Sequence, residues 1–145
     1  MALPATDLLA LYAGATPHKP AVLEGPTTLI HGEFYPNNIL VDRTAIRPVD
    51  WESAAMAAGE VDLATLTEGW ATDDEGVLVD RYRTARWLTK APPGFEERYQ
   101  AARAYSACRR LSDFSEWTPD ADRYLDQLLD AATRLGLADM ASRPA

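Results

Sequence analysis

The stretch LIHGEFYPNNILVDRTAIRPVDWESAAMAAGEVDLATL, residues 29–66, decides the fold of this chain. Short apolar runs alternate in it with polar and turn-forming residues, which is typical of strands and loops. The runs are Leu29-Ile30, Ile39-Leu40-Val41 and Ala45-Ile46 with Val49. Because only Asp42, Arg43 and Thr44 separate the second run from the third, a hairpin is expected there. Such a hairpin would place Asn38 and Asp50, at its open end, close together.

Outside this stretch the sequence is mostly helical in character. Before it we expect one short helix, over residues 4–13, which Gly14 and the prolines after it bring to an end. After it, helix-breaking residues lie at Gly59, Asp73-Asp74, Pro92-Pro93-Gly94 and Trp117-Thr118-Pro119. We therefore expect four helices, over residues 61–72, 75–90, 94–111 and 119–135.

The first and the last of these four helices have the most informative patterns. In the first, Leu63 and Trp70 share one side with Leu66, which predicts that this side packs inward. The last has Thr118 as its N-cap, Pro119 at its first position and Gly136 as its stop.

Composition and charge exclude several classes of protein. A chain of 145 residues with 47% hydrophobic and 25% charged residues has the composition of one ordinary folded domain. Its net charge is −8 and it has no basic block to neutralise phosphates, so nucleic acid is not an expected partner. The single cysteine, Cys108, and an N-terminus without a charged leader segment predict a cytoplasmic protein. No apolar run approaches the roughly 18 residues of a membrane-spanning helix, so a membrane is not an expected partner either.

The polar residues of the deciding stretch meet the needs of phosphoryl transfer. A kinase-type site needs a carboxylate that positions the acceptor hydroxyl, and an Asn and an Asp that hold magnesium against the nucleotide phosphates. Glu33 and Asn38 are five positions apart, the same step as from Asp to Asn in the kinase pattern H-R-D-x-x-x-x-N. Asp50 follows across the expected hairpin. These three residues form the candidate active site, although an inert site that keeps them would have the same sequence.

The same stretch resembles the aminoglycoside phosphotransferase and choline kinase superfamily. Residues 31–38, HGEFYPNN, match its catalytic loop H-G-D-x-x-x-x-N. Residues 49–52, VDWE, match the segment whose Asp binds the metal, and residues 59–64, GEVDLA, match a shortened form of its G-D-P-x-x-D-L-A element. Three ordered matches make the resemblance specific.

The resemblance implies an α+β fold, mostly α, that corresponds to the C-terminal lobe of a protein-kinase-like fold. In this lobe a small β-hairpin carries the catalytic loop and packs on a helical subdomain. Residues 1–145 would form this single lobe. Its expected parts are a short helix and loop (1–27), the catalytic loop and metal-binding hairpin (28–52), the helical subdomain (53–136) and a tail (137–145).

The resemblance also implies a reaction and the residues that perform it. The reaction is Mg-ATP-dependent transfer of the γ-phosphoryl group to a hydroxyl of a small molecule, such as an aminoglycoside or an amino alcohol. Glu33 would be the catalytic residue, and Asn38 and Asp50 would bind Mg²⁺.

Four further residues receive supporting roles from the resemblance. His31 would brace the catalytic loop. Asp62, buried at the start of its helix, would hold the loop backbone by hydrogen bonds. Trp51 and Glu52 are candidates for contact with the acceptor or with the surroundings of the metal.

Two departures from the family pattern affect the expected activity. Glu33 stands where the family has Asp, and its extra methylene moves the carboxylate by about one C–C bond. Only 30 residues precede His31, and they contain one lysine, Lys19, and two glycines, Gly14 and Gly25. They cannot supply the Gly-rich loop and the strand lysine with which kinases hold ATP, so we expect the N-terminal ATP-binding lobe to be absent. The isolated chain is then expected to be inactive and to need a second chain or the missing lobe.

Two other interpretations stay open from the sequence. The chain could be a non-catalytic binding or regulatory module derived from a kinase-like lobe, which the expected absence of the other lobe favours. It could also be a truncated form of a longer enzyme, which fits the retained Glu-Asn-Asp order. If another lobe or chain normally covers the strands, apolar side chains near residues 28–50 are expected to be exposed.

Overall fold

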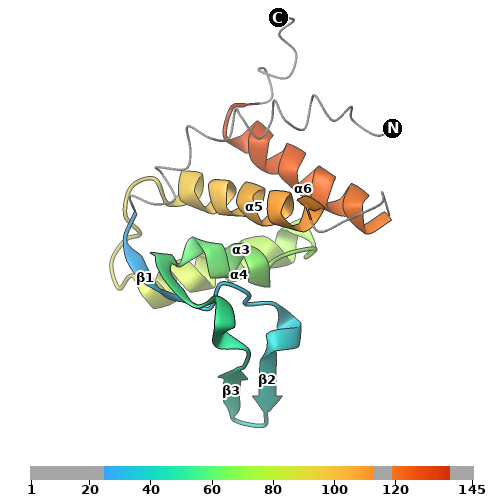
Figure 1. The fold of residues 1–145 in the computed structure, drawn as a ribbon. Helices are drawn as coiled ribbons and strands as arrows, with labels where there is room; N and C mark the ends of the chain where they lie inside the picture. Colours follow the sequence, from blue (N-terminus) through green and yellow to red (C-terminus); the bar gives the residue numbers. More distant parts are fainter. Residues whose placement is uncertain (1–24, 113–118, 138–145) are drawn as a thin grey trace, which may run out of the picture.

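Two small antiparallel sheets and a set of α-helices make up the described part of the chain. The structure, a computed structural model, describes residues 25–112 and 119–137 (Figure 1). The strands and short 3-10 helices are β1 (Thr27–Ile30), η2 (Pro36–Asn38), β2 (Ile39–Asp42), β3 (Ala45–Pro48), η3 (Trp51–Ser53) and β4 (Ala55–Ala58). The α-helices are α3 (Glu60–Leu66), α4 (Thr72–Arg86), α5 (Phe95–Ser112) and α6 (Pro119–Arg134).

The predicted β2–β3 hairpin is confirmed, with a turn one residue shorter than the expected Asp42-Arg43-Thr44 step. Ile39 pairs with Pro48 and Asp42 pairs with Ala45, so the two-residue turn consists of Arg43 and Thr44. The fold class expected from the sequence is also confirmed, since the described residues are mostly helical with small antiparallel sheets.

Strand β4 was not predicted. Its sequence, AMAA, has no β-branched residue and lies where the sequence is helical in character. It forms a strand because it pairs with β1, with Thr27 opposite Ala58 and Ile30 opposite Ala55. Tertiary pairing therefore overrides local preference at this position.

The helices differ from prediction mainly at their ends. The first helix was expected to continue to residue 72 with Trp70 on its inner side, and this was wrong: α3 ends at Leu66, Gly69 has a φ of +78°, and Trp70 is exposed. The predicted break at residues 73–74 was also wrong. These acidic residues lie in the first turn of α4, where their negative charges interact favourably with the positive end of the helix dipole. Helix α4 then ends at Arg86 rather than at residue 90.

The last two helices agree with prediction. Helix α5 covers residues 95–112, against an expected 94–111, and Gly136 follows α6 with a φ of +73°, as a helix stop requires. Thr118 and the short helix expected over residues 4–13 lie outside the described residues.

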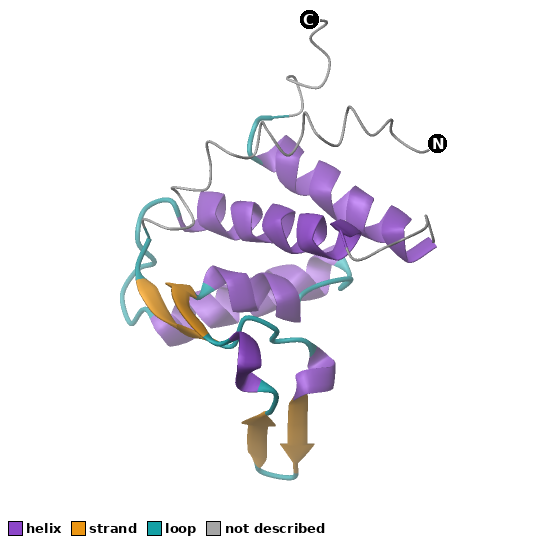
Figure 2. Cartoon of the chain, in the orientation of Figure 1, coloured by secondary structure: helices purple, strands orange, loops and turns teal. Residues whose placement is uncertain are grey.

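Two hydrophobic clusters join the helices into one body. The first lies between β1, α3, α4 and α5 and contains Ile30, Val61, Leu63, Ala64, Val79, Phe95, Tyr99 and Ala102. The second lies between α5 and α6 and contains Ala104, Ala107, Leu128 and Ala131. Helix α5 is therefore sandwiched between α3 and α6, while the hairpin projects away from the helices (Figures 1 and 2).

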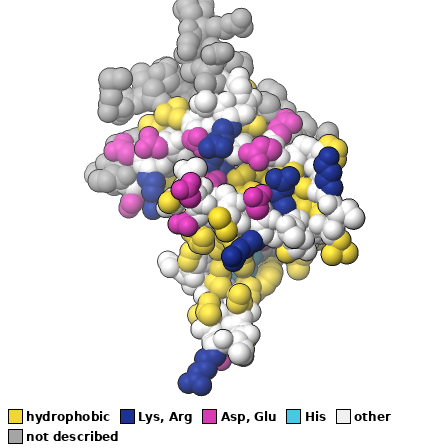
Figure 3. Space-filling view, turned by 180° about the vertical axis from the view of Figure 1, so that it is seen from behind, with side chains coloured by type: hydrophobic (Ala, Val, Ile, Leu, Met, Phe, Trp, Pro, Cys, Tyr) yellow, Lys and Arg dark blue, Asp and Glu magenta, His cyan; other side chains and the backbone are white. Residues whose placement is uncertain are grey.

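Apolar side chains are exposed on both sheets. They are Leu29, Leu40, Val41, Ile46 and Met56, and hydrophobic side chains gather on this lower part of the molecule in Figure 3. The exposure expected near residues 28–50 is thus present. Among the described helices, none combines the length and the apolar character needed to cross a bilayer.

Candidate active site

The two sheets bracket the candidate site from both sides. Both sheets join the same two chain segments, because β1 pairs with β4 and β2 pairs with β3. Residues 31–38 leave β1 and enter β2, and residues 49–54 leave β3 and enter β4 (Figure 2). The two loops are therefore held beside each other, and they carry the candidate residues predicted from the sequence, apart from Asp62 in α3.

His31 connects the two loops from inside. Its side chain is almost fully buried, and its ring packs against Trp51 with ring centroids 4.7 Å apart. Its Nδ1 accepts from the backbone N–H of Glu33 at 3.3 Å, so Nε2 carries the proton and donates to the carbonyl oxygen of Val49 at 2.8 Å. The imidazole thus fixes the residue before Asp50 to the loop that carries Glu33.

Asp62 holds the same loop from α3. Its carboxylate accepts from the backbone N–H of His31 at 2.6 Å and from that of Gly32 at 2.8 Å. The side chain is half-buried rather than buried as expected, because it lies at the boundary between α3 and the loop. Gly32 has a φ of +83°, and a Cβ there would collide with the carbonyl oxygen of Ser53, so only glycine fits.

Asn38 and Asp50 lie on adjacent parts of the two loops. The backbone N–H of Val49 donates to the carbonyl oxygen of Asn38 at 2.9 Å. The side-chain amide of Asn38 donates to the carbonyl oxygen of Glu33 at 3.0 Å, which leaves its Oδ1 as an acceptor. Asp50 has a φ of 66° and a ψ of 62°, a left-handed conformation that Asp tolerates better than most residues, and it is exposed.

The oxygens of Asn38 and Asp50 suit magnesium by their chemistry. Mg²⁺ binds hard oxygen ligands, takes one or two from the protein, and keeps water and substrate phosphates for the rest of its shell. Among residues 25–112 and 119–137 no three His, Cys, Asp or Glu side chains cluster as a metal site.

Glu33 has a partner that the sequence did not reveal. The Nη2 group of Arg109, in the last turn of α5, donates to Glu33 Oε1 at 2.7 Å, and Nη1 donates to the carbonyl oxygen of Gly32 at 3.4 Å. Next to it, the guanidinium of Arg110 lies 4.0 Å from the ring centroid of Tyr35. No motif marks these arginines, because they are more than 70 residues from the loop in sequence.

The two remaining candidates differ in their contacts. Trp51 donates from Nε1 to the carbonyl oxygen of Pro48 at 3.0 Å and packs on His31, so it contributes to the loop geometry. Glu52 is exposed and forms no hydrogen bond or ion pair with another residue in the described ranges.

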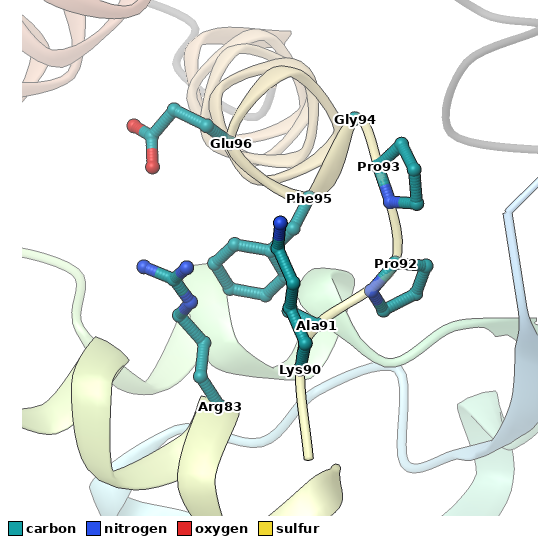
Figure 4. A pocket seen from close by; sticks show the side chains of 8 residues that line it. All are labelled: Arg83, Lys90, Ala91, Pro92, Pro93, Gly94, Phe95 and Glu96. Carbon is teal, nitrogen blue, oxygen red and sulfur yellow. The ribbon is translucent and has the colours of Figure 1, made fainter.

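A cavity of about 350 Å³ lies between α4 and the start of α5 (Figure 4). It is lined by Arg83, Lys90, Ala91, Pro92, Pro93, Gly94, Phe95 and Glu96. The guanidinium of Arg83 lies 5.1 Å from the centroid of the Phe95 ring. None of the candidate residues lines this cavity, so it is separate from the site in the loops.

The arrangement of loops, small sheets and helices is that of part of a kinase-like fold. A solved structure with this fold is that of a choline/ethanolamine kinase family protein from Mesorhizobium loti, with a TM-score of 0.68 and 17% sequence identity. The match covers 97% of this chain and 51% of that one, so this chain spans about half the length of its structural relative.

The sequence places the chain in a family. Residues 2–103 match the phosphotransferase enzyme family, and the chain belongs to this family. The search of curated proteins gave no match.

Proposed function

We propose that this chain provides the acceptor-positioning and metal-binding half of a phosphotransferase site. The reaction is transfer of the γ-phosphoryl group of ATP to a hydroxyl of a small molecule. The observation that carries the proposal is the bracketing of two loops by two sheets, which gathers Glu33, Asn38 and Asp50 in one place. Membership of the phosphotransferase enzyme family supports it.

We assign each residue of the site a task. Glu33 positions the acceptor hydroxyl, and Asn38 Oδ1 and the Asp50 carboxylate hold Mg²⁺, which neutralises charge on the phosphates when bound. His31 and Asp62 keep the loops in register through the hydrogen bonds described above. Because phosphoryl transfer depends on alignment more than on strong base catalysis, fixed loop geometry is the main contribution of this half.

The proposed acceptor is a cationic hydroxyl compound, such as an aminoglycoside or an amino alcohol. The net charge of −8 attracts cations, and Glu52 offers an exposed carboxylate beside Asp50. None of the described strands contains the lysine with which kinases hold ATP phosphates. We therefore propose that an N-terminal lobe or a second chain completes the nucleotide site and covers the exposed apolar side chains of the sheets.

The test measures phosphate transfer from labelled ATP by the complete enzyme, in which this chain is joined by the lobe or second chain that supplies the nucleotide site. The assay contains Mg²⁺ and a panel of aminoglycosides and amino alcohols. Asp50→Ala and Asn38→Ala should each lower transfer by about 100-fold or more, because each removes a metal ligand. Asp42→Ala is the matched control, since Asp42 is an exposed carboxylate on the same hairpin, and it should leave transfer unchanged.

A second readout does not depend on turnover. Mn²⁺ can replace Mg²⁺ and broadens the NMR signals of nearby nuclei, so in the presence of ATP it should broaden the signals of residues 38 and 49–51. Asp50→Ala should abolish this effect and Asp42→Ala should not. Transfer and broadening that survive Asp50→Ala would show that the metal site is elsewhere.

A further inference from the structure

Arg109 makes a specific contact with the candidate catalytic carboxylate. Its guanidinium donates two hydrogen bonds to the catalytic loop, to Glu33 Oε1 at 2.7 Å and to the carbonyl oxygen of Gly32 at 3.4 Å. The Glu33 side chain is 21% exposed and that of Arg109 is 39% exposed. The pair of Arg47 and Asp42 on the hairpin differs, because both side chains are largely exposed and the closest atoms are 4.0 Å apart.

The neighbouring arginine anchors the same loop at a second point. Arg110 lies over the ring of Tyr35, and its Nε is 3.6 Å from Glu68 Oε2. Burial raises the pKa of the Tyr35 phenol above its ordinary value, so the ring stays neutral under the cation at physiological pH. The last turn of α5 therefore contacts the loop at two residues, Glu33 and Tyr35.

We propose that Arg109 is the positioning residue of Glu33 and selects the orientation in which this longer carboxylate can face the acceptor. Glu has one more rotatable bond than Asp, so an unrestrained Glu33 would spread its carboxylate over several positions. The bond from Arg109 fixes Oε1, and among the described residues no hydrogen bond reaches Oε2. Arg109 thus leaves one carboxylate oxygen for the acceptor hydroxyl. This inference rests on the proposed phosphotransferase function.

The kinetic test compares variants of the two residues in the same transfer assay. Arg109→Met removes the donors but keeps an apolar stem, and it should lower kcat about 10- to 100-fold while the KM for ATP changes less than about twofold. Arg109→Lys, which keeps the charge and one donor, should recover part of this loss. Arg134→Met, which removes an exposed arginine of α6, is the control and should leave kcat unchanged.

A double variant separates positioning from general support of the fold. If Arg109 acts through Glu33, Glu33→Gln combined with Arg109→Met should lose no more activity than the worse single variant. Losses that multiply, or a kcat that Arg109→Met leaves unchanged, would overturn the proposal.

A non-kinetic arm keeps the two proposals distinguishable. A complete enzyme, in which this chain is joined by the lobe or second chain that supplies the nucleotide site, counts against the proposed function if it transfers no phosphate. Amide hydrogen exchange of the chain then decides the role of Arg109. Arg109→Met should speed exchange at residues 33–35, 37 and 38 by about tenfold or more, and Arg134→Met should not. Unchanged exchange in this loop would overturn the positioning role.

Discussion

The loops that carry the candidate site and the helices behind them are stabilised in different ways. The helices share two apolar clusters, and most of the inner side of α5 is buried. In the loops, His31 and Gly32 are buried, and the geometry rests on a few hydrogen bonds made by the side chains of His31, Asp62 and Arg109. A substitution in the helices should therefore weaken the whole fold, and one in the loops should release a local segment.

Two pairs of a glutamate with an arginine show the same difference. In the helices, Glu60 and Arg98 are 3.1 Å apart and their side chains are 1% and 6% exposed. Within the part of the chain that the structure describes, one oxygen of Glu60 and one nitrogen of Arg98 have no hydrogen-bond partner. The pair of Glu33 and Arg109 reaches solvent, where a substrate can also reach it. The buried pair is thus suited to specifying how α3 packs on α5, and the accessible pair is suited to contact with a substrate.

The strongest test of this comparison is Arg98→Met. It leaves the Glu60 carboxylate buried without its cation, which should lower the free energy of unfolding by about 3–5 kcal/mol. Urea denaturation measures this loss. Adding Glu60→Leu should recover most of it, because the uncompensated buried charge is then gone. If Arg98→Met costs less than about 1 kcal/mol, the buried pair contributes no more than an exposed ion pair does, and the two glutamate–arginine pairs do not differ in their effect on stability.

An intermediate effect is expected for Asp62→Ala in the loop region. The variant removes the acceptor for two backbone N–H groups, and hydrogen bonds to a charged group contribute about 1.5–3 kcal/mol each. Water can reach these groups once the loop opens, so the global loss should be smaller, about 1–2 kcal/mol. Amide exchange should speed up at residues 31 and 32 and stay unchanged in α5.

A matched control for this experiment is Asp73→Ala, an exposed acidic residue in the first turn of α4. It should change neither the exchange of the loop nor that of α5. If Asp62→Ala instead speeds exchange uniformly through the helices, the loops and the helices form one cooperative unit.

The parts of the fold that were predictable from sequence are those with local causes. The β2–β3 hairpin follows from two apolar runs separated by a short polar connection, and the end of α6 follows from Gly136. Strand β4 could not be predicted, because its partner β1 lies 25 or more residues away and its own residues favour a helix. Trp70 was placed inward because the helical period was extended past Leu66, where the chain leaves the helix.

The candidate site also has residues that the sequence predicted and one that it did not. The spacing of Glu33, Asn38 and Asp50 is local information, and the structure places them on two loops joined by the hydrogen bond from Val49 to Asn38. Arg109 carries no such signal, since an arginine near the C-terminal end of a helix is usual for reasons of helix dipole and solvation. Only its hydrogen bond to Glu33 in the folded structure distinguishes it from the other arginines of that helix.

The smallest expected effect concerns Asp130 of α6. Burial raises the pKa of this carboxyl, but hydrogen bonds from Arg103 and Arg134 outweigh burial and hold the pKa below its ordinary value. A carboxyl with a lowered pKa in the folded state contributes its full stability above the unfolded pKa near 3.8 and loses it as the pH falls through the lower folded pKa. Because its side chain is 42% exposed, Asp130→Asn should cost no more than about 1 kcal/mol at neutral pH.

The loss of unfolding free energy at this pair can be compared with the loss at Glu60 and Arg98, to show whether burial or separation sets the cost of breaking an ion pair. Urea denaturation of Asp130→Asn and wild type should differ at neutral pH and converge as the pH falls through the lowered pKa of Asp130, whereas the exposed Asp126→Asn on the same helix is a control that should match wild type at neutral pH. Arg103 lies 2.6 Å from Asp130, closer than Arg98 to Glu60 at 3.1 Å. A smaller loss at the shorter pair would mean that desolvation, rather than separation, sets the cost of breaking these contacts. If Asp130→Asn instead costs more than Arg98→Met, the contact of α6 with α5 contributes more to the stability of the helices than the contact of α3 with α5 does.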